Sequence, residues 1–448
     1  MRILIVGAGA VGFHLSKHLS EEGHDIVLID PDPDRVSHAQ EQLDILAITG
    51  NGASLDVLER AGIEKTDMLV AVTNVDEVNL VAGMSAMQYG VKIKVARISN
   101  PDYFTHPIPL RSARQGVDVM INPELECARE TYQLLQSEAA TELAFFAEGR
   151  VQLLGLRVRP DAPVVGVKLA ELAETIKNRQ FLTAAILRGD ETIIPRGDNT
   201  IEADDLVYII GESRQMPRVL ELAGYQDFRL RRVMIAGGAR EETVYLAQLL
   251  ADHDIDCTII EPDRERCLEL AERLDKALVL VGDATDQELL EMEGIEEVDG
   301  FVAYTTSDAT NILSGLLAKS HDAHRVVVRI GRIEYIPLVS RIGIDAAVSP
   351  RLSTVNTILK YVRRGGVLSV AALRGIDAEV IEFSVSSDSR IIGRRVADIH
   401  FPEHSLVGAV QRGDLIIIPD GDTVFAPGDQ VTVLALPDAL GAVERLFA

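Results

Sequence analysis

Residues 1–12 read MRILIVGAGAVG, and residues 231–242 read RRVMIAGGAREE. In the first stretch an apolar run leads directly into Gly7, Gly9 and Gly12, and an amphipathic segment follows. A strand that ends in a glycine-rich turn and continues as a helix is the opening of a doubly wound α/β domain. The second stretch repeats the apolar run and the first glycine, so the plan of the chain begins again near residue 231.

The repeat extends along both halves of the chain in the same order. Three matched pairs are MLVAVTNVDEVNL from Met68 with GFVAYTTSDATNI from Gly300, VARI at Arg97 with VVRI at Arg329, and LRGDETIIPRGD from Leu187 with QRGDLIIIPDGD from Gln411. A duplication of this length means two copies of one composite unit, so function has to be assigned to the pair.

Composition restricts the class of protein. The chain has 448 residues, of which 47% are hydrophobic and 25% charged, as in ordinary globular proteins. No apolar run approaches the roughly 18–20 residues of a membrane span, and the N-terminus shows no signal-peptide pattern. We therefore expect a cytoplasmic protein without direct membrane insertion.

Charge and cysteine content exclude further classes. A net charge of −25 makes nucleic-acid binding unlikely on electrostatic grounds. The 3 cysteines are odd in number and lack CxxC spacing, which argues against a disulfide framework or a cysteine-rich zinc site. We expect no metal site.

Each copy divides into two parts of different pattern. In the first part, runs rich in Val and Ile alternate with amphipathic segments, which predicts a parallel sheet covered by helices on both faces. In the second part, shorter β-type runs surround turn signals, which predicts a small α+β module. The expected boundaries are 1–123 and 231–350 for the sheet domains, 124–143 and 351–366 for helical connectors, and 144–225 and 367–448 for the small modules.

The first copy carries a complete dinucleotide-binding pattern. Gly7 permits a tight turn, Gly9 lets backbone N–H groups approach a pyrophosphate, and Gly12 permits close packing of the helix on the strand. Asp30 ends the second predicted strand, where a carboxylate can accept both ribose hydroxyls and favours NAD or adenosine over a 2′-phosphate. The alternative is a purely structural turn.

Two further predicted strands end in polar residues of the first copy. Thr73 and Asn74 end the fourth strand, at the carboxyl edge where such sheets bind ligands. Arg97 ends the fifth strand, and its planar guanidinium can contact a phosphate. A helix cap or turn is the alternative for Thr73, and a structural ion pair is the alternative for Arg97.

The glycine-rich turn of the second copy is incomplete. Gly237 aligns with Gly7, but Ala239 replaces Gly9 and Glu242 replaces Gly12. Glu241 and Glu242 place negative charge at a helix N-terminus, where it competes with an anionic ligand. The positions of Asp30, Thr73 and Arg97 are still filled, by Glu261, Thr305 and Arg329, and Asp283 is also present. We expect weaker nucleotide binding here than in the first copy.

No catalytic residues accompany these binding patterns. There is no Tyr-x₃-Lys pair, and no separate substrate domain brings an acid, a base and an anion-binding group together. The chain is therefore expected to bind a dinucleotide without being an enzyme.

The chain resembles the TrkA family, the cytosolic regulatory subunits of bacterial Trk potassium uptake systems. The supporting stretches are GAGAVG with Asp30, MLVAVTNVDEVN from Met68, VARI at Arg97, GDATDQELL from Gly282 and YVRRGGVLSV from Tyr361. The resemblance covers essentially the whole chain. It implies two tandem RCK units (regulators of potassium conductance), each with a Rossmann-like N-subdomain and a small C-subdomain.

The resemblance also implies the nucleotide-contacting residues. They are Gly7, Ala8, Gly9, Ala10, Val11, Gly12, Asp30, Thr73, Asn74 and Arg97 in the first copy, and Gly237, Gly238, Ala239, Arg240, Glu241, Glu261 and Thr305 in the second. The ligand it implies is NAD(H), with ATP or ADP as possible occupants of the same site.

The implied function is gating. The resemblance implies a ring at the cytoplasmic face of the inner membrane, under a TrkH- or TrkG-type potassium channel subunit. Because closed symmetry is the usual solution for such assemblies, we expect a homodimer or homotetramer. Two alternatives remain open at this stage. One is a regulatory subunit of another cation transporter or antiporter, and the other is an NAD-dependent dehydrogenase.

Overall fold

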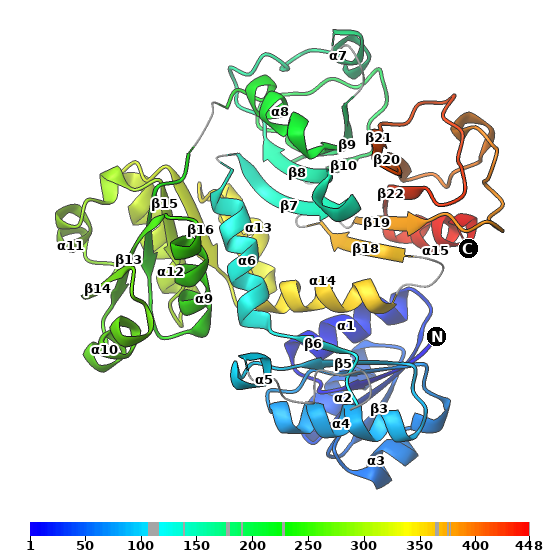
Figure 1. The fold of residues 1–448 in the computed structure, drawn as a ribbon, viewed down its shortest axis with the longest axis horizontal. Coiled ribbons are helices and arrows are strands. Elements are labelled where there is room, and N and C mark those ends of the chain that lie inside the picture. The colour runs from blue at the N-terminus through cyan, green and yellow to red at the C-terminus, as the bar shows by residue number, and fades with distance from the viewer. Residues whose placement is uncertain are drawn as a thin grey trace. The chain divides into compact units, whose positions relative to one another are not determined.

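The computed structural model describes residues 1–105, 116–137, 139–175, 180–189, 191–225, 229–362, 367–373, 376 and 378–447 (Figure 1). The chain forms two compact units. The first unit comprises Met1–Cys127 and Pro350–Val362, and the second comprises Ala128–Ser349 and Arg363–Ala448. Among the described residues, no helix has the length and apolar character that crossing a membrane requires.

The first unit contains a parallel sheet of six strands in the order β3-β2-β1-β4-β5-β6. Its strands are β1 (Arg2–Val6), β2 (Asp25–Asp30), β3 (Leu46–Thr49), β4 (Met68–Ala71), β5 (Ile93–Arg97) and β6 (Val119–Ile121). Its helices are α1 (Ala10–Glu21), α2 (Pro33–Gln42), α3 (Leu55–Arg60), α4 (Asp76–Gln88), α5 (Asp102–Thr105) and α14 (Pro350–Val362). The central strands are buried along nearly their full length, because helices cover both faces of the sheet.

The second unit contains a sheet of the same order, β14-β13-β12-β15-β16-β17. Its strands are β12 (Arg232–Ala236), β13 (Asp256–Glu261), β14 (Ala277–Val281), β15 (Gly300–Ala303), β16 (Arg325–Arg329) and β17 (Ala346–Val348). Its helices are α9 (Glu241–Asp252), α10 (Arg264–Arg273), α11 (Gln287–Met292), α12 (Asp308–Ser320) and α13 (Ile336–Arg341). The predicted pair of doubly wound parallel sheets is therefore confirmed.

Two five-stranded antiparallel sheets form the small modules of the second unit. The first has the order β10-β9-β11-β8-β7, and the second has the equivalent order β21-β20-β22-β19-β18. The first consists of β7 (Ala140–Phe146), β8 (Val151–Arg157), β9 (Phe181–Arg188), β10 (Glu191–Ile193) and β11 (Leu206–Glu212), with α7 (Leu169–Thr175) and α8 (Met216–Leu222). The second consists of β18 (Val367–Ala372), β19 (Glu379–Ser384), β20 (Ser405–Arg412), β21 (Leu415–Ile417) and β22 (Gln430–Ala435), with α15 (Pro437–Phe447).

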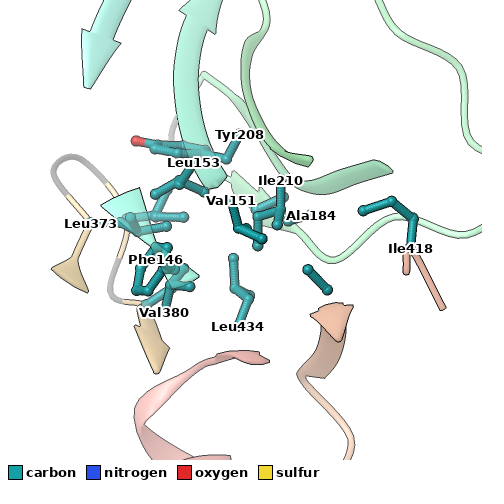
Figure 2. Close-up of a cluster of buried hydrophobic side chains, with 14 of the residues drawn as sticks. Phe146, Val151, Leu153, Ala184, Tyr208, Ile210, Leu373, Val380, Ile418 and Leu434 are labelled. Atoms are coloured by element: carbon teal, nitrogen blue, oxygen red, sulfur yellow. The ribbon is translucent and has the colours of Figure 1, made fainter. Parts of the chain in front are cut away.

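The two small modules share one hydrophobic core. Figure 2 shows Phe146, Leu153 and Tyr208 of the first module in the same cluster as Val380 and Leu434 of the second. A buried polar contact accompanies this packing, because the backbone N–H of Ala147 donates to Glu382 Oε1 at 2.7 Å. The two small modules thus contact each other directly through buried side chains.

The connector after the first sheet is shorter than the expected helix over 124–143. Helix α6 spans Pro123–Leu135, and β7 begins at Ala140. Residues 140–143 therefore form part of a strand, which pairs antiparallel with β8, with Ala140 opposite Leu156 and Leu143 opposite Leu154. The last turns of α6 belong to the second unit, where the Thr131 and Tyr304 hydroxyls hydrogen bond and Arg325 Nε donates to the Leu134 carbonyl at 3.1 Å.

The connector after the second sheet packs in the first unit. Helix α14 contacts α1 and β5, although it follows β17 directly in the sequence. Residues 363–366 of the expected connector lie outside the described residues.

Candidate nucleotide-binding site

The glycine-rich turn of the first copy joins β1 to α1 and depends on two glycines for its shape. Gly7 has a φ of +108°, a conformation that other residues rarely adopt. A Cβ on Gly12 would lie 1.8 Å from the Gly7 carbonyl oxygen, so only glycine permits this packing of the helix on the turn. Gly9 is different, because a Cβ there would meet no atom within 4 Å. The surface over Gly9 is therefore open to a ligand.

The N-terminus of α1 favours an anion at this opening. Gly9 is the N-cap residue, no side chain caps the helix, and its first turn carries no acidic residue. Free backbone N–H groups and the helix dipole together attract negative charge.

Asp30 ties the glycine-rich turn to the end of β2. Its Oδ2 accepts the Ala8 N–H at 2.6 Å, and its Oδ1 accepts the Asp32 N–H at 2.9 Å. The residue is only 4% exposed. The carboxylate therefore positions the turn, and acceptance of ribose hydroxyls by its remaining lone pairs stays a prediction. Arg35, whose Nη1 lies 4.0 Å from Asp30 Oδ2, is more than half exposed and was not predicted from the sequence.

Thr73 is held by a buried asparagine on α4. Asn79 Oδ1 accepts both the Thr73 N–H, at 3.0 Å, and the Thr73 hydroxyl, at 2.7 Å. Its amide nitrogen donates to the Arg97 carbonyl at 2.8 Å. Asn79 thus fixes the ends of β4 and β5 relative to each other, while Asn74 is exposed beside them. The match of Asn79 with Asn311 in the repeat was the available signal for this role.

Arg97 has a counter-ion in the connector helix. Its Nη2 lies 3.5 Å from Glu124 Oε1 in the first turn of α6 and donates to Ser99 Oγ at 3.3 Å. Its Nε is buried without a hydrogen-bond partner. Asp76 organises the same edge by accepting the N–H groups of Ser99 and Asn100. The guanidinium therefore retains hydrogen-bonding capacity that no described residue uses.

The second copy keeps the same frame. Gly237 has a φ of +101°, and Glu261 Oε2 accepts the Gly238 N–H at 2.6 Å, as Asp30 does with Ala8. Asn311 accepts from the Thr305 N–H at 2.8 Å and donates to the Arg329 carbonyl at 2.9 Å. Gly237, Glu261 and Asn311 thus have the roles of Gly7, Asp30 and Asn79, but the position of Gly12 is occupied by Glu242.

The charges at the turn differ from those in the first copy. Glu242 is 2% exposed, and its Oε1 lies 3.0 Å from Arg329 Nε. Glu241 pairs with Arg273 at 2.6 Å and with Arg266 at 3.4 Å, and the Arg273 hydrogen bond lowers the pKa of Glu241. Helix α9 begins at Glu241, one position later than α1 begins at Ala10. Ala239 is exposed, and Arg240 is the N-cap residue of α9.

Family comparisons agree with this architecture. The TrkA-N domain model matches residues 3–123 and 233–350, and the TrkA-C domain model matches residues 153–224 and 380–448. The chain belongs to the TrkA family. The Trk system potassium uptake protein TrkA homolog 1 of Methanosarcina mazei is 40% identical, with 100% of both chains covered. The TrkA protein of Halomonas elongata is 37% identical, covering 100% of this chain and 98% of that protein.

Solved structures of GsuK share the fold of this TrkA-family chain. The GsuK RCK domain and the GsuK channel bound to NAD each match with a TM-score of 0.60 and 19% identity over 100% of this chain. The match covers 94% of the RCK-domain chain and 78% of the channel chain. The predicted tandem RCK fold is confirmed.

Proposed function

We propose that this chain is a nucleotide-binding regulatory subunit that gates a Trk-type potassium channel. The observation that carries the proposal is the complete glycine-rich turn of the first copy, with open space over Gly9 at the N-terminus of α1. Family membership supports the potassium system, since the relatives are named as Trk potassium uptake proteins. The GsuK channel bound to NAD shows that this fold accommodates NAD in another protein.

The residues of the first copy fit NAD(H) or an adenine nucleotide. The N–H groups from Gly9 to Val11 face the place of the phosphates, and Asp30 lies at the place of the ribose. Arg97 supplies a positive charge at the neighbouring strand end. Val11, Gly12 and Thr73 line the proposed nucleotide site. The side chains of Ala8 and Ala10 are small and leave room for the ligand. These residues bind and orient a nucleotide; the role we assign to them is regulatory and not catalytic.

Gating requires that the nucleotide bind two conformations with different affinity. Helix α6 is suited to respond, because its first turn carries Glu124 beside Arg97 and its last turn is held by Arg325 in the second unit. A phosphate bound to Arg97 weakens the ion pair between Arg97 and Glu124. This change alters the first turn of α6. We infer that homodimers or homotetramers use this change in a cytoplasmic ring on a TrkH- or TrkG-type subunit.

Titration of NADH, NAD⁺, ATP and ADP into the full chain tests the site. Asp30→Ala should weaken binding about tenfold or more, since charge-assisted hydrogen bonds contribute about 1.5–3 kcal/mol each. Asp44→Ala, an exposed change in the same copy, is the control. Equal affinity in the Asp30 variant and the control would refute the assignment.

Potassium flux into vesicles that contain a TrkH-type subunit tests the gating role. We expect flux to depend on this protein and on the nucleotide, and the dependence to be reduced by Asp30→Ala. Flux that is indifferent to the protein under every nucleotide that binds would leave a nucleotide-binding protein without a gating role.

A further inference from the structure

The arginine that ends the fifth strand has a different counter-ion in each copy. In the first copy Arg97 lies 3.5 Å from Glu124, which belongs to helix α6 and not to the glycine-rich turn. In the second copy Arg329 faces Glu242, which lies within the glycine-rich turn itself, at 3.0 Å. Helix α14 of the second copy matches α6, and its residue equivalent to Glu124 is Arg351, which is exposed.

Glu242 occupies the position of Gly12, and its carboxylate reaches Arg329 at the end of β16. Its side chain is 3% exposed and that of Arg329 is 12% exposed, so the pair is largely removed from water. A carboxylate and a phosphate present the same oxygen acceptors to a guanidinium. The chain thus supplies an anion at the place where the first copy leaves Arg97 Nε without a partner.

Further contacts join the glycine-rich turn of the second copy to α10. Arg266 Nε donates to the Gly238 carbonyl at 2.9 Å, and its guanidinium also contacts Glu241. Arg35, the matching residue of the first copy, instead has an exposed side chain near Asp30 and Asp32. In the second copy the turn is therefore fixed to α10 by side chains, without a ligand.

We propose that Glu242 is a resident anion that takes the place of a ligand phosphate on Arg329 and excludes nucleotides from the second copy. Each chain then binds one nucleotide, in the first copy only. The second copy then does not respond to the nucleotide concentration. This inference rests on the proposed function, because it assumes that the Arg97 position contacts phosphate.

Removal of Glu242 should create a second binding site. Burying Arg329 without its counter-ion is unfavourable, so an incoming phosphate should be attracted to it. We expect Glu242→Gly to raise the number of ATP or NADH molecules bound per full-length chain from one to two, as measured by equilibrium dialysis. Glu242→Gln retains the shape and removes only the charge, so it should show the same gain at lower affinity if the glycine variant folds poorly.

Two controls assign the gained site. Glu297→Ala removes an exposed acid of the same copy, which pairs with Arg232 away from the turn, and should leave one nucleotide per chain. Glu242→Gly combined with Arg329→Ala should lose the gained site. Thermal melting without ligand should show a lower Tm for Glu242→Gly and a larger rise on adding nucleotide than in the unmodified chain.

The outcomes separate this inference from the proposed function. Two equivalent sites in the unmodified chain, or a single site in both folded Glu242 variants, would overturn the inference and leave the proposed function intact. No binding by the unmodified chain but one nucleotide bound by Glu242→Gly would support exclusion of the nucleotide by Glu242, but it would remove the proposed function and the single site assigned to the first copy. No binding by any variant would overturn both.

Discussion

At the scale of single residues, the same amino acid has different roles in one turn. Gly7 and Gly12 are required by the backbone, since one has a positive φ and the other touches a carbonyl oxygen. Gly9 faces open space and has an ordinary backbone conformation, with a φ of −66°. The fold therefore does not require glycine at position 9, and we expect that the nucleotide does.

Gly9→Ala and Gly12→Ala form a matched pair that separates binding from folding. Gly9→Ala should change the stability by less than about 1 kcal/mol, because nothing opposes its Cβ, and should weaken nucleotide binding about tenfold or more. Gly12→Ala should destabilise the chain by about 1–3 kcal/mol or more, because its Cβ overlaps the Gly7 carbonyl. Thermal melting and nucleotide titration check the two effects; a Gly9 variant that binds normally would show that no ligand approaches this residue.

At the scale of elements, helix α6 connects the candidate site to the rest of the chain. Sequence pattern predicts a helix here but not what it packs on. Glu124 lies in its first turn beside Arg97, and Thr131 lies on its later turns beside Tyr304. Helix α6 therefore contributes residues to both units.

Glu124→Gln should increase the nucleotide affinity of the first copy. The carboxylate competes with a phosphate for Arg97, and a neutral amide competes less. We expect a gain of up to about fivefold, because partly exposed ion pairs of this kind contribute about 1 kcal/mol or less. Titration calorimetry measures the gain, and Glu64→Gln, an exposed change in the same unit, is the control. Weaker binding would show that Glu124 helps to hold the nucleotide.

At the scale of the whole molecule, duplication has produced two copies that are equal in fold and unequal in charge. The sheets share one strand order and the small modules share another. The small modules also share a core, and the buried carboxyl of Glu382 accepts the N–H of Ala147 from this core. Burial raises the pKa of Glu382 above its ordinary value of 4.5, more than the Ala147 N–H lowers it.

The packing of the small modules should therefore depend on pH through Glu382. A carboxyl whose pKa is raised by folding stabilises the folded state below about pH 4.5, and this contribution is lost as the pH rises through the folded pKa. Glu382→Gln keeps an acceptor for Ala147 and removes the ionisation. We expect the variant to exceed the unmodified chain in stability at pH 7–8 by on the order of 1 kcal/mol, and to lose this advantage towards pH 4.5.

Calorimetric Tm values from pH 4.5 to 8 measure this difference. Glu191→Gln, an exposed carboxyl of the first small module, should follow the unmodified chain at every pH. A constant difference between Glu382→Gln and the unmodified chain over the whole range would show that ionisation of Glu382 is not involved.

The sequence by itself determined the duplicated plan, the two doubly wound sheets and the glycine-rich turns. These features follow from local patterns: apolar runs predict buried strands, and glycines at fixed spacing predict a turn before a helix. The incomplete turn at Ala239 and Glu242 was also evident from the sequence, as was the repeat that pairs Arg97 with Arg329.

Only the tertiary structure decided what these residues contact. Asp30 and Glu261 hold backbone N–H groups, and Glu242 reaches Arg329, because strands far apart in sequence end at the same edge of a sheet. Helix α14 packs on α1, and residues 140–143 form a strand where a helix was expected. Partners of this kind depend on long-range packing and on the direction of each side chain, which a local pattern of residues does not encode.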